Sequence, residues 1–229
     1  MPPAARPGRL VIGSKRYSSW SLRGWLAVQM AALDVAEEVI ALEETPSAAI
    51  RAATPTGLVP YLEHAGVKVW ETIAIAEYCA EQAPGLWPAD TALRAHARAI
   101  SAEMHAGFRG QRQAMPMNLG RDFVGGGRTP EALADIARIE TIWREARAIG
   151  GGPFLSGAGF TLADAMFAPV VTRFLTWRPV LAADSEAYMA AVRAHPLMER
   201  WYAEAAAEPA TWRLDKYENP PHVPVAIPA

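Results

Sequence analysis

Alternating and helical spacings of apolar residues organise the first third of the chain into an α/β unit. A short apolar run at 10–13 predicts a strand, and apolar residues at helical spacing from Ser21 onward predict an amphipathic helix that ends near Asp34. Further patterns predict strands within 35–42, 59–63 and 67–70, a helical piece at 47–53, a turn at 65–66 and a helix from Thr72. The predicted order is therefore β-α-β-α-β-β-α.

Beyond residue 83 the pattern predicts helices alone. Their expected ranges are about 91–114, 130–149, 162–178, 186–195 and 197–207. The stretch "APGLWPAD", residues 83–90, carries two prolines and a glycine, which is typical of a linker. We therefore predict an α/β domain over 9–83, a linker over 84–90 and an all-helical domain over 91–218. Residues 1–8 and 219–229 are predicted to form extended tails.

Composition narrows the class of protein. The 229 residues are 51% hydrophobic and 20% charged, as in an ordinary globular chain, and the net charge of -2 gives no basic excess for nucleic acid or an anionic membrane. No apolar stretch approaches the roughly 20 residues that span a bilayer, and the first residues lack the apolar core of a signal peptide. The single cysteine, Cys79, excludes an intrachain disulfide and fits a reducing compartment. We expect a cytoplasmic enzyme or binding protein.

The first candidate for chemistry is "SSWS", residues 18–21, where the first strand gives way to a helix. Ser21 is the expected N-cap of that helix, because serine is favoured there. Ser18, Ser19 and Ser21 cannot all cap one helix, so a spare hydroxyl would sit at the positive end of the helix dipole. A hydroxyl donor at that position would stabilise a thiolate and lower the pKa of a bound thiol by roughly one to two.

Two other short stretches fit the recognition of a peptide-like ligand. In "TGLVPYLE", a cis bond between Val59 and Pro60 would turn the chain and leave the Val59 backbone free to pair with an extended peptide, although most X–Pro bonds are trans. In "WETIAIAEY", Glu71 and Thr72 lie where a strand ends and a helix begins. Thr72 either caps this helix or receives a ligand carboxylate there, while Glu71 is either solvated or binds a ligand ammonium group.

The sequence gives little support for a metal site, a glycine-rich phosphate loop or a reactive cysteine. The five histidines are scattered without metal-ligand spacing, so no metal site is predicted. The stretches "GGGR" and "GGGP" follow no predicted strand and are expected to be connectors. Cys79 lies on the buried side of a predicted helix and is expected to pack, and no C-x-x-C motif suggests a dithiol oxidoreductase.

Together, in this order and ahead of an all-helical segment, these stretches resemble the glutathione S-transferase family, over about residues 10–201. The resemblance is strongest in "YSSWSLR", in "TPTGLVPYLE" with "WETIAIAEYC", and in "FTLADAMFAP", where Thr161 and Asp164 form a capping box that serves folding. Among the serine-type members it is closest to the zeta class. It implies a thioredoxin-like α/β N-terminal domain, an all-α C-terminal domain, glutathione as co-substrate and a homodimer.

The resemblance also implies residue roles. The thiol-activating serine falls on Ser18, with Ser19 the close alternative. The positions implied to bind glutathione are Trp20, Leu58, Val59, Pro60, Glu71 and Thr72. Three of them depart from the zeta pattern: Trp20 replaces a cysteine, Leu58 replaces a polar residue and Thr72 replaces a serine. Candidates for the acceptor site lie in "EMHAGFRGQRQAMPMNLG" and are His105, Phe108, Arg109 and Arg112; an arginine directed into the cleft would favour a carboxylated acceptor or the glycine carboxylate of glutathione.

The expected activity is the attack of a serine-stabilised glutathione thiolate on a small electrophile, as in detoxification. One alternative is a glutathione-dependent cis–trans isomerase of the maleylacetoacetate type, to which Trp20 is the main objection. The other is a module that binds glutathione or a protein partner without turnover. The sequence does not identify the electrophile and does not decide between Ser18 and Ser19.

Overall fold

A four-stranded mixed sheet forms the N-terminal part of the protein. The computed structural model describes residues 8–45 and 47–221. The strands are β1 (Gly8–Gly13), β2 (Ala36–Ile40), β3 (Tyr61–His64) and β4 (Val67–Trp70). They are arranged in the order β2-β1-β3-β4, with β1 parallel to β2 and antiparallel to β3, and β3 antiparallel to β4. The predicted order of elements in this part is confirmed.

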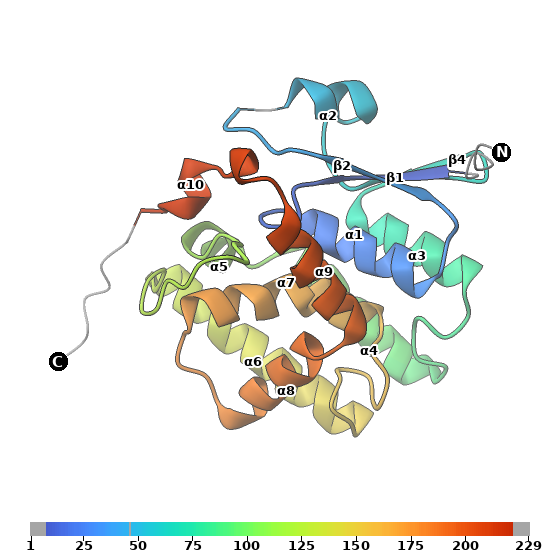
Figure 1. Ribbon diagram of the computed structural model, residues 1–229. Coiled ribbons are helices and arrows are strands. Elements are labelled where there is room, and N and C mark those ends of the chain that lie inside the picture. The colour runs from blue at the N-terminus through green and yellow to red at the C-terminus, as the bar shows by residue number, and fades with distance from the viewer. Residues whose placement is uncertain (1–7, 46, 222–229) are drawn as a thin grey trace.

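Helices cover the sheet on both sides (Figure 1). Helices α1 (Ser19–Met30) and α3 (Thr72–Gln82) lie on one side, and the short α2 (Ala48–Ala53) lies on the other. The central strand β1 is apolar on both faces because Leu10, Val11 and Ile12 are all buried. Cys79 is fully buried in α3, and burial raises the pKa of its thiol to about 12, as expected of a packing residue.

The second part of the chain is helical. Its helices are α4 (Thr91–Ala106), α5 (Arg109–Ala114), α6 (Pro130–Gly150), α7 (Leu162–Trp177), α8 (Ala183–Arg193), α9 (Pro196–Ala207) and α10 (Asp215–Glu218), with a 3₁₀ turn at Ala210–Trp212. Helix α7 is buried along almost its whole length and contacts α1, α4 and α8. It therefore forms the centre of the helical part and joins it to the α/β part.

The structure corrects several predicted boundaries. The helix expected over 91–114 is two helices, because the chain turns at Gly107 and Phe108, where Phe108 has a left-handed φ of 60°. The first helix ends at Met30 rather than near Asp34. The predicted tail over 1–8 lies outside the described residues apart from Gly8, which belongs to β1, and 222–229 lie outside them as well.

The predicted capping box at the start of α7 is confirmed. The carboxylate of Asp164 accepts hydrogen bonds from the backbone and hydroxyl of Thr161, at 2.8 and 2.9 Å, from the backbone of Leu155 and from the hydroxyl of Tyr188. Burial nevertheless raises the pKa of Asp164 to about 6, because these hydrogen bonds only partly offset the loss of solvent.

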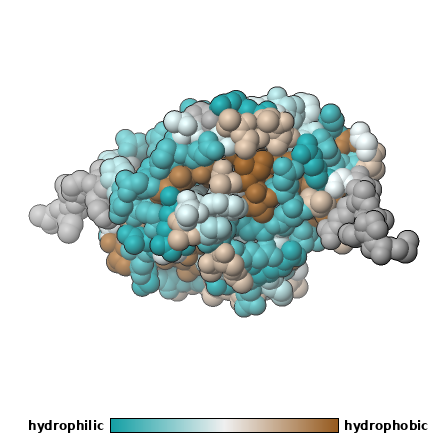
Figure 2. Space-filling model, turned by 45° about the horizontal axis from the view of Figure 1, so that its top comes forward, coloured by the Kyte–Doolittle hydropathy of each residue, from teal (hydrophilic) through white to brown (hydrophobic). Residues whose placement is uncertain are grey.

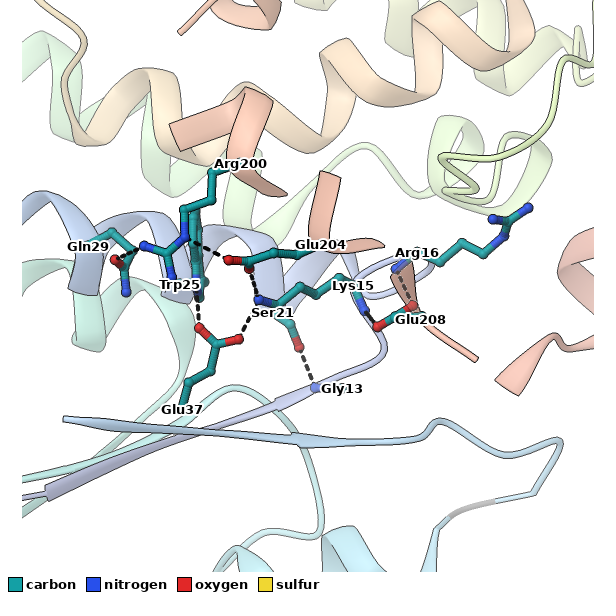
Figure 3. A network of polar contacts seen from close by, with 10 residues as sticks. All are labelled: Gly13, Lys15, Arg16, Ser21, Trp25, Gln29, Glu37, Arg200, Glu204 and Glu208. Atoms are coloured by element: carbon teal, nitrogen blue, oxygen red, sulfur yellow. Dashed lines mark hydrogen bonds and ion pairs between the residues drawn. The ribbon is translucent and has the colours of Figure 1, made fainter. Parts of the chain in front are cut away.

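A buried lysine ties the loop after β1 to the C-terminal helices (Figure 3). Lys15 is 4% exposed and forms ion pairs with Glu37 of β2 and Glu204 of α9. Its ammonium group lies 5.3 and 5.2 Å from the ring centres of Trp25 and Trp201. The backbone N–H groups of this loop are held as well, because the Glu208 carboxylate accepts from residues 15 and 16. The loop that leads to Ser18 is therefore fixed to the helical part.

The surface of the protein carries both hydrophobic and hydrophilic residues. In the view of Figure 2, hydrophobic residues gather near the middle of the face, with hydrophilic residues around them. Within the described part of the chain, no helix combines the length and apolar character needed to cross a membrane.

Candidate active site

Two adjoining hollows lie where α1 and α3 begin. The larger has a volume of about 600 Å³ and contains Ser18 and Ser19 in its lining. The smaller, of about 120 Å³, is lined by Pro60, Glu71 and Thr72 among others. Residues Trp20, Leu58 and Val59 line both hollows, so the two form one continuous site along the edge of the α/β part.

The Val59–Pro60 peptide bond is cis, as the resemblance implies. Pro60 is buried against α1, which approaches so closely that a Cβ at Gly24 would lie 2.6 Å from the Pro60 Cγ atom. This close approach explains a glycine within a helix, where it is otherwise unfavourable. Val59 is left partly exposed at the junction of the two hollows.

Helix α3 begins at the smaller hollow without a side-chain cap. Glu71 occupies the N-cap position with a left-handed φ of 64°, and it makes no capping hydrogen bond. Thr72 is the first helical residue and is buried, so the alternative in which Thr72 caps the helix is wrong. The start of α3 therefore lines the smaller hollow without a side-chain cap on its first N–H groups, and the positive end of the helix dipole there favours an anion.

Ser18, rather than the expected Ser21, is the N-cap of α1. The Ser18 hydroxyl accepts a hydrogen bond from the Ser21 backbone at 3.2 Å, and the two Oγ atoms lie 2.7 Å apart. The Ser21 hydroxyl accepts from the Gly13 backbone at 2.9 Å (Figure 3). Ser21 thus joins strand β1 to the Ser18 hydroxyl, which lines the larger hollow.

Ser19 has a different partner. Its hydroxyl accepts a hydrogen bond at 3.0 Å from the guanidinium of Arg173, which comes from the C-terminal half of α7 and also lines the larger hollow. Ser19 is 6% exposed and Arg173 is 5% exposed. The two candidate serines are therefore both at the hollow, one held by the α/β part and the other by the helical part.

Tyr17 also lines the larger hollow, but its hydroxyl is directed to the C-terminal segment. It donates to the Glu218 carboxylate at 2.6 Å, and its ring stacks on Tyr217 at 5.0 Å between centres. Burial and the bond to Glu218 raise the pKa of Tyr17 to about 12. A hydroxyl engaged in this way is a poor donor for a second group.

Trp20 is surrounded by cationic and ionisable side chains. The guanidinium groups of Arg112 and Arg23 lie 4.6 and 4.9 Å from its ring centre, and the edge of His105 approaches it at 5.3 Å between ring centres. His105 Nε2 lies 3.7 Å from a Glu71 carboxylate oxygen. Burial lowers the pKa of His105, against the opposing effect of Glu71, so the imidazole is neutral at neutral pH.

The four acceptor-site candidates are not brought together. Arg112 lines the larger hollow, and His105 lies beside Glu71 and Trp20. Phe108 is buried in the core, and Arg109 lines a separate hollow beside α6 with Glu131. Arg173 was missed by sequence reasoning; its one signal is that it interrupts the apolar run of a buried helix.

The residues that could hold a metal are not clustered. Across residues 8–45 and 47–221, no group of three or more histidine, cysteine, aspartate or glutamate side chains is arranged to hold an ion.

Two family models identify the class of protein to which this fold and site belong. The N-terminal domain of glutathione S-transferases matches residues 17–82, and the C-terminal domain of the same family matches residues 127–204. The two matches together span more than half of the chain. The protein belongs to the glutathione S-transferase family.

Solved structures share the fold at low sequence identity. A glutathione transferase homolog from Burkholderia gl BGR1, crystallised with bound glutathione, is 20% identical and has a TM-score of 0.66, covering 89% of this chain and 100% of that one. A theta class glutathione S-transferase from Xanthomonas axonopodis pv. citri with glutathione bound is 22% identical and has a TM-score of 0.60, covering 86% and 97%. A glutathione S-transferase from Rhodospirillum rubrum F11 is 20% identical, with a TM-score of 0.61, covering 85% and 91%. A comparison with curated proteins found no match.

Proposed function

We propose that the protein is a glutathione S-transferase in which Ser18 stabilises the glutathione thiolate. The observation that carries the proposal is the Ser18 hydroxyl, which lies at the N-terminus of α1 and lines a hollow of about 600 Å³. Family membership and the two neighbours crystallised with glutathione support glutathione as the ligand.

The smaller hollow suits the γ-glutamyl end of glutathione. A carboxylate would bind the open N-terminus of α3 at Thr72, and the ammonium group would pair with Glu71. The cysteinyl backbone would pair with Val59 beside the cis bond, as an added strand. The thiol then enters the larger hollow beside Ser18.

The hydrogen bonds around Ser18 leave it able to donate. A hydroxyl has one donor and two acceptor lone pairs, and the bond between the Ser18 and Ser21 hydroxyls can run in either direction. When Ser21 donates, the Ser18 oxygen accepts from the backbone and hydroxyl of Ser21, and its own proton is free for the thiolate sulfur. Hydroxyls linked in a chain polarise one another, which strengthens the last donor.

The reaction requires no base from Ser18, because the serine donates a hydrogen bond and keeps its proton. The thiol releases its proton to solvent, and the thiolate forms a carbon–sulfur bond with the electrophile. In a substitution, the leaving group departs with the electron pair of the bond that breaks. Stabilisation of the thiolate near neutral pH raises the concentration of the reactive species.

Replacement of Ser18 tests this proposal. Ser18→Ala is expected to raise the pKa of enzyme-bound glutathione by roughly one to two, because a hydrogen bond to a charged group is worth about 1.5–3 kcal/mol. The pKa is measured from the ultraviolet absorbance of the thiolate in a pH titration of the complex, with glutathione affinity followed by calorimetry. Ser19→Ala is the matched variant and is expected to change this pKa less.

The outcomes distinguish Ser18 from Ser19 and the transferase from its two alternatives. A thiol pKa that is unchanged in Ser18→Ala but raised in Ser19→Ala would transfer the role to Ser19. Glutathione binding by the wild type without conjugation of any electrophile would favour the binding module, and turnover of a cis-alkene without a stable conjugate would favour the isomerase. The domain boundaries, the homodimer and the cytoplasmic location stay predictions.

A further inference from the structure

Three arginines lie together beneath and beside the larger hollow. Arg23 of α1 and Arg112 of α5 both donate to the Met104 sulfur, at 3.3 and 3.4 Å. Arg23 and Arg173 meet at Ser19, where Arg23 donates to the backbone oxygen at 3.3 Å and Arg173 to the hydroxyl. We call Arg23, Arg112 and Arg173 the arginine cluster.

The arginine cluster has no carboxylate in ion-pair contact among the described residues. Its hydrogen-bond partners are neutral: backbone oxygens, the Ser19 hydroxyl and the Met104 sulfur. Two atoms of Arg173, Nε and Nη1, and Nη1 of Arg112 are buried without a hydrogen-bond partner in the described structure. Buried arginines are normally paired, so this arrangement calls for an anion from outside the chain.

The cations remain charged although the site disfavours them. Burial lowers the pKa of Arg173 to about 9, with a further lowering by Arg112. Burial lowers the pKa of Arg112 to about 10, against the effect of Asp135. Both values lie above neutral pH, so at least two positive charges face the hollow in the working protein.

The acidic groups near the hollow do not neutralise the arginine cluster. Glu43 and Glu44 are exposed in the lining of the same hollow, where the Glu44 carboxylate lies 3.5 Å from the ammonium of Lys216. Glu71 is at the smaller hollow beside His105. The part of the larger hollow lined by Arg112 and Arg173 is therefore positive, and it includes the partner of Ser19 beside the position proposed for the thiolate.

We propose that the acceptor substrate carries a carboxylate or similar anionic group that binds the arginine cluster, chiefly Arg173 and Arg112, while its electrophilic carbon faces the glutathione sulfur. This inference rests on the proposed function and names the substrate class for the same site. An anion here would neutralise charges that the fold leaves unpaired, and guanidinium groups bind carboxylates strongly.

A matched pair of electrophiles tests the proposal. Chloronitrobenzoate and the corresponding chloronitrobenzamide, of the same substitution pattern, both react by carbon–sulfur bond formation with loss of chloride. For each, kcat/KM is divided by the rate constant for free glutathione thiolate, which removes the intrinsic difference in reactivity. The wild type is expected to favour the acid about tenfold or more.

Variants assign the preference to the arginine cluster. Arg173→Gln and Arg112→Gln are each expected to raise KM for the acid more than for the amide, which brings the two electrophiles close to parity. Arg144→Gln is the matched control, because Arg144 is 57% exposed on α6, pairs with Asp184 and does not line the hollow. It should keep the acid preference of the wild type.

The outcomes separate this inference from the proposed function. Conjugation of both electrophiles without an acid preference overturns the inference and leaves the function standing. An equal loss for both electrophiles in Arg173→Gln, with a raised pKa of bound glutathione, would mean that Arg173 acts on the sulfur and would also overturn it. If neither compound turns over, calorimetric binding of the acid but not the amide, lost in Arg173→Gln, would still support the anion site, and equal or absent binding of both would overturn it; the proposed function is tested separately by the pKa of bound glutathione in Ser18→Ala.

Discussion

At the scale of single residues, Arg173 is an unusual feature of the helical core. It lies in the C-terminal half of α7, which is otherwise mostly apolar, and within the described part of the chain its guanidinium has one hydrogen bond, to Ser19. Burial of a cation is costly unless it is paired, and removal of such a charge often stabilises a fold. The cost is understandable if the residue is kept for a ligand rather than for folding.

Stability measurements can detect this cost. In the absence of ligand, Arg173→Met is expected to increase the free energy of unfolding, on the order of 1–4 kcal/mol, because methionine fills the space without a charge to desolvate. Urea unfolding followed by circular dichroism measures the change, and Arg144→Met on the surface should shift it by less than about 0.5 kcal/mol. A marked loss of stability in Arg173→Met would show that the fold depends on the guanidinium.

Residues at the site differ in how far the sequence predicts them. The serines, the Val-Pro pair and Glu71 lie in short local stretches whose turn and capping chemistry is readable, so their positions could be predicted. Which serine caps α1 could not be decided locally, because Ser21 is drawn to the Gly13 backbone of a neighbouring strand. Arg173 could not be assigned at all, since the lack of a carboxylate partner depends on packing between α1, α5 and α7.

At the scale of elements, the start of α7 depends on Asp164. Its carboxylate satisfies the Thr161 and Leu155 N–H groups within a buried site. Asp164→Asn keeps one acceptor but places an NH₂ group against these donors, so we expect a loss of about 1–3 kcal/mol in the free energy of unfolding. Thermal or urea unfolding of the two proteins measures it.

The raised pKa of Asp164 predicts that the free energy of unfolding depends on pH. The pKa of Asp164 in the folded protein is about 6, above the ordinary value of about 3.9, so the folded state favours the protonated form. The stabilisation that comes from this preference for the protonated Asp164 is therefore fully present below about pH 4. It is lost as the pH rises through about 6, which lowers the free energy of unfolding by about 3 kcal/mol. Unfolding free energies at several pH values should show this change in the wild type and not in Asp164→Asn; parallel curves would contradict it.

The break between α4 and α5 shows that the spacing of apolar residues alone does not predict where a helix ends. Apolar spacing continues through 91–114, which predicted one helix, but Gly107 and the left-handed Phe108 turn the chain. The glycine was a visible signal, whereas the direction of the turn was not. That turn puts Arg112, an acceptor-site candidate of the sequence analysis, over Trp20, so the position of this arginine in the site follows from the bend.

At the scale of the whole molecule, the arrangement into a sheet-containing part and a helical part was predictable, from the change in periodicity near residue 83 and from the family resemblance. The site is less predictable because it is shared between the parts. Ser18 and Val59 come from the first, and Arg112 and Arg173 from the second. Only contacts distant in sequence, such as that between Ser19 and Arg173, create the combined surface.

Because Lys15 is buried, the rate at which its amine reacts with a reagent in solution measures how often the surrounding structure opens. The chain has lysines only at 15, 68 and 216, and Lys68 lies exposed on β4. An amine-acylating reagent should therefore modify Lys68 quickly. It should modify Lys15 only when the contact between α9 and α1 opens. Peptide mass spectrometry over time would give the frequency of that opening, and Glu204→Gln should accelerate acylation of Lys15 alone. Equal rates at 15 and 68 in the native protein would mean that the enclosure is short-lived.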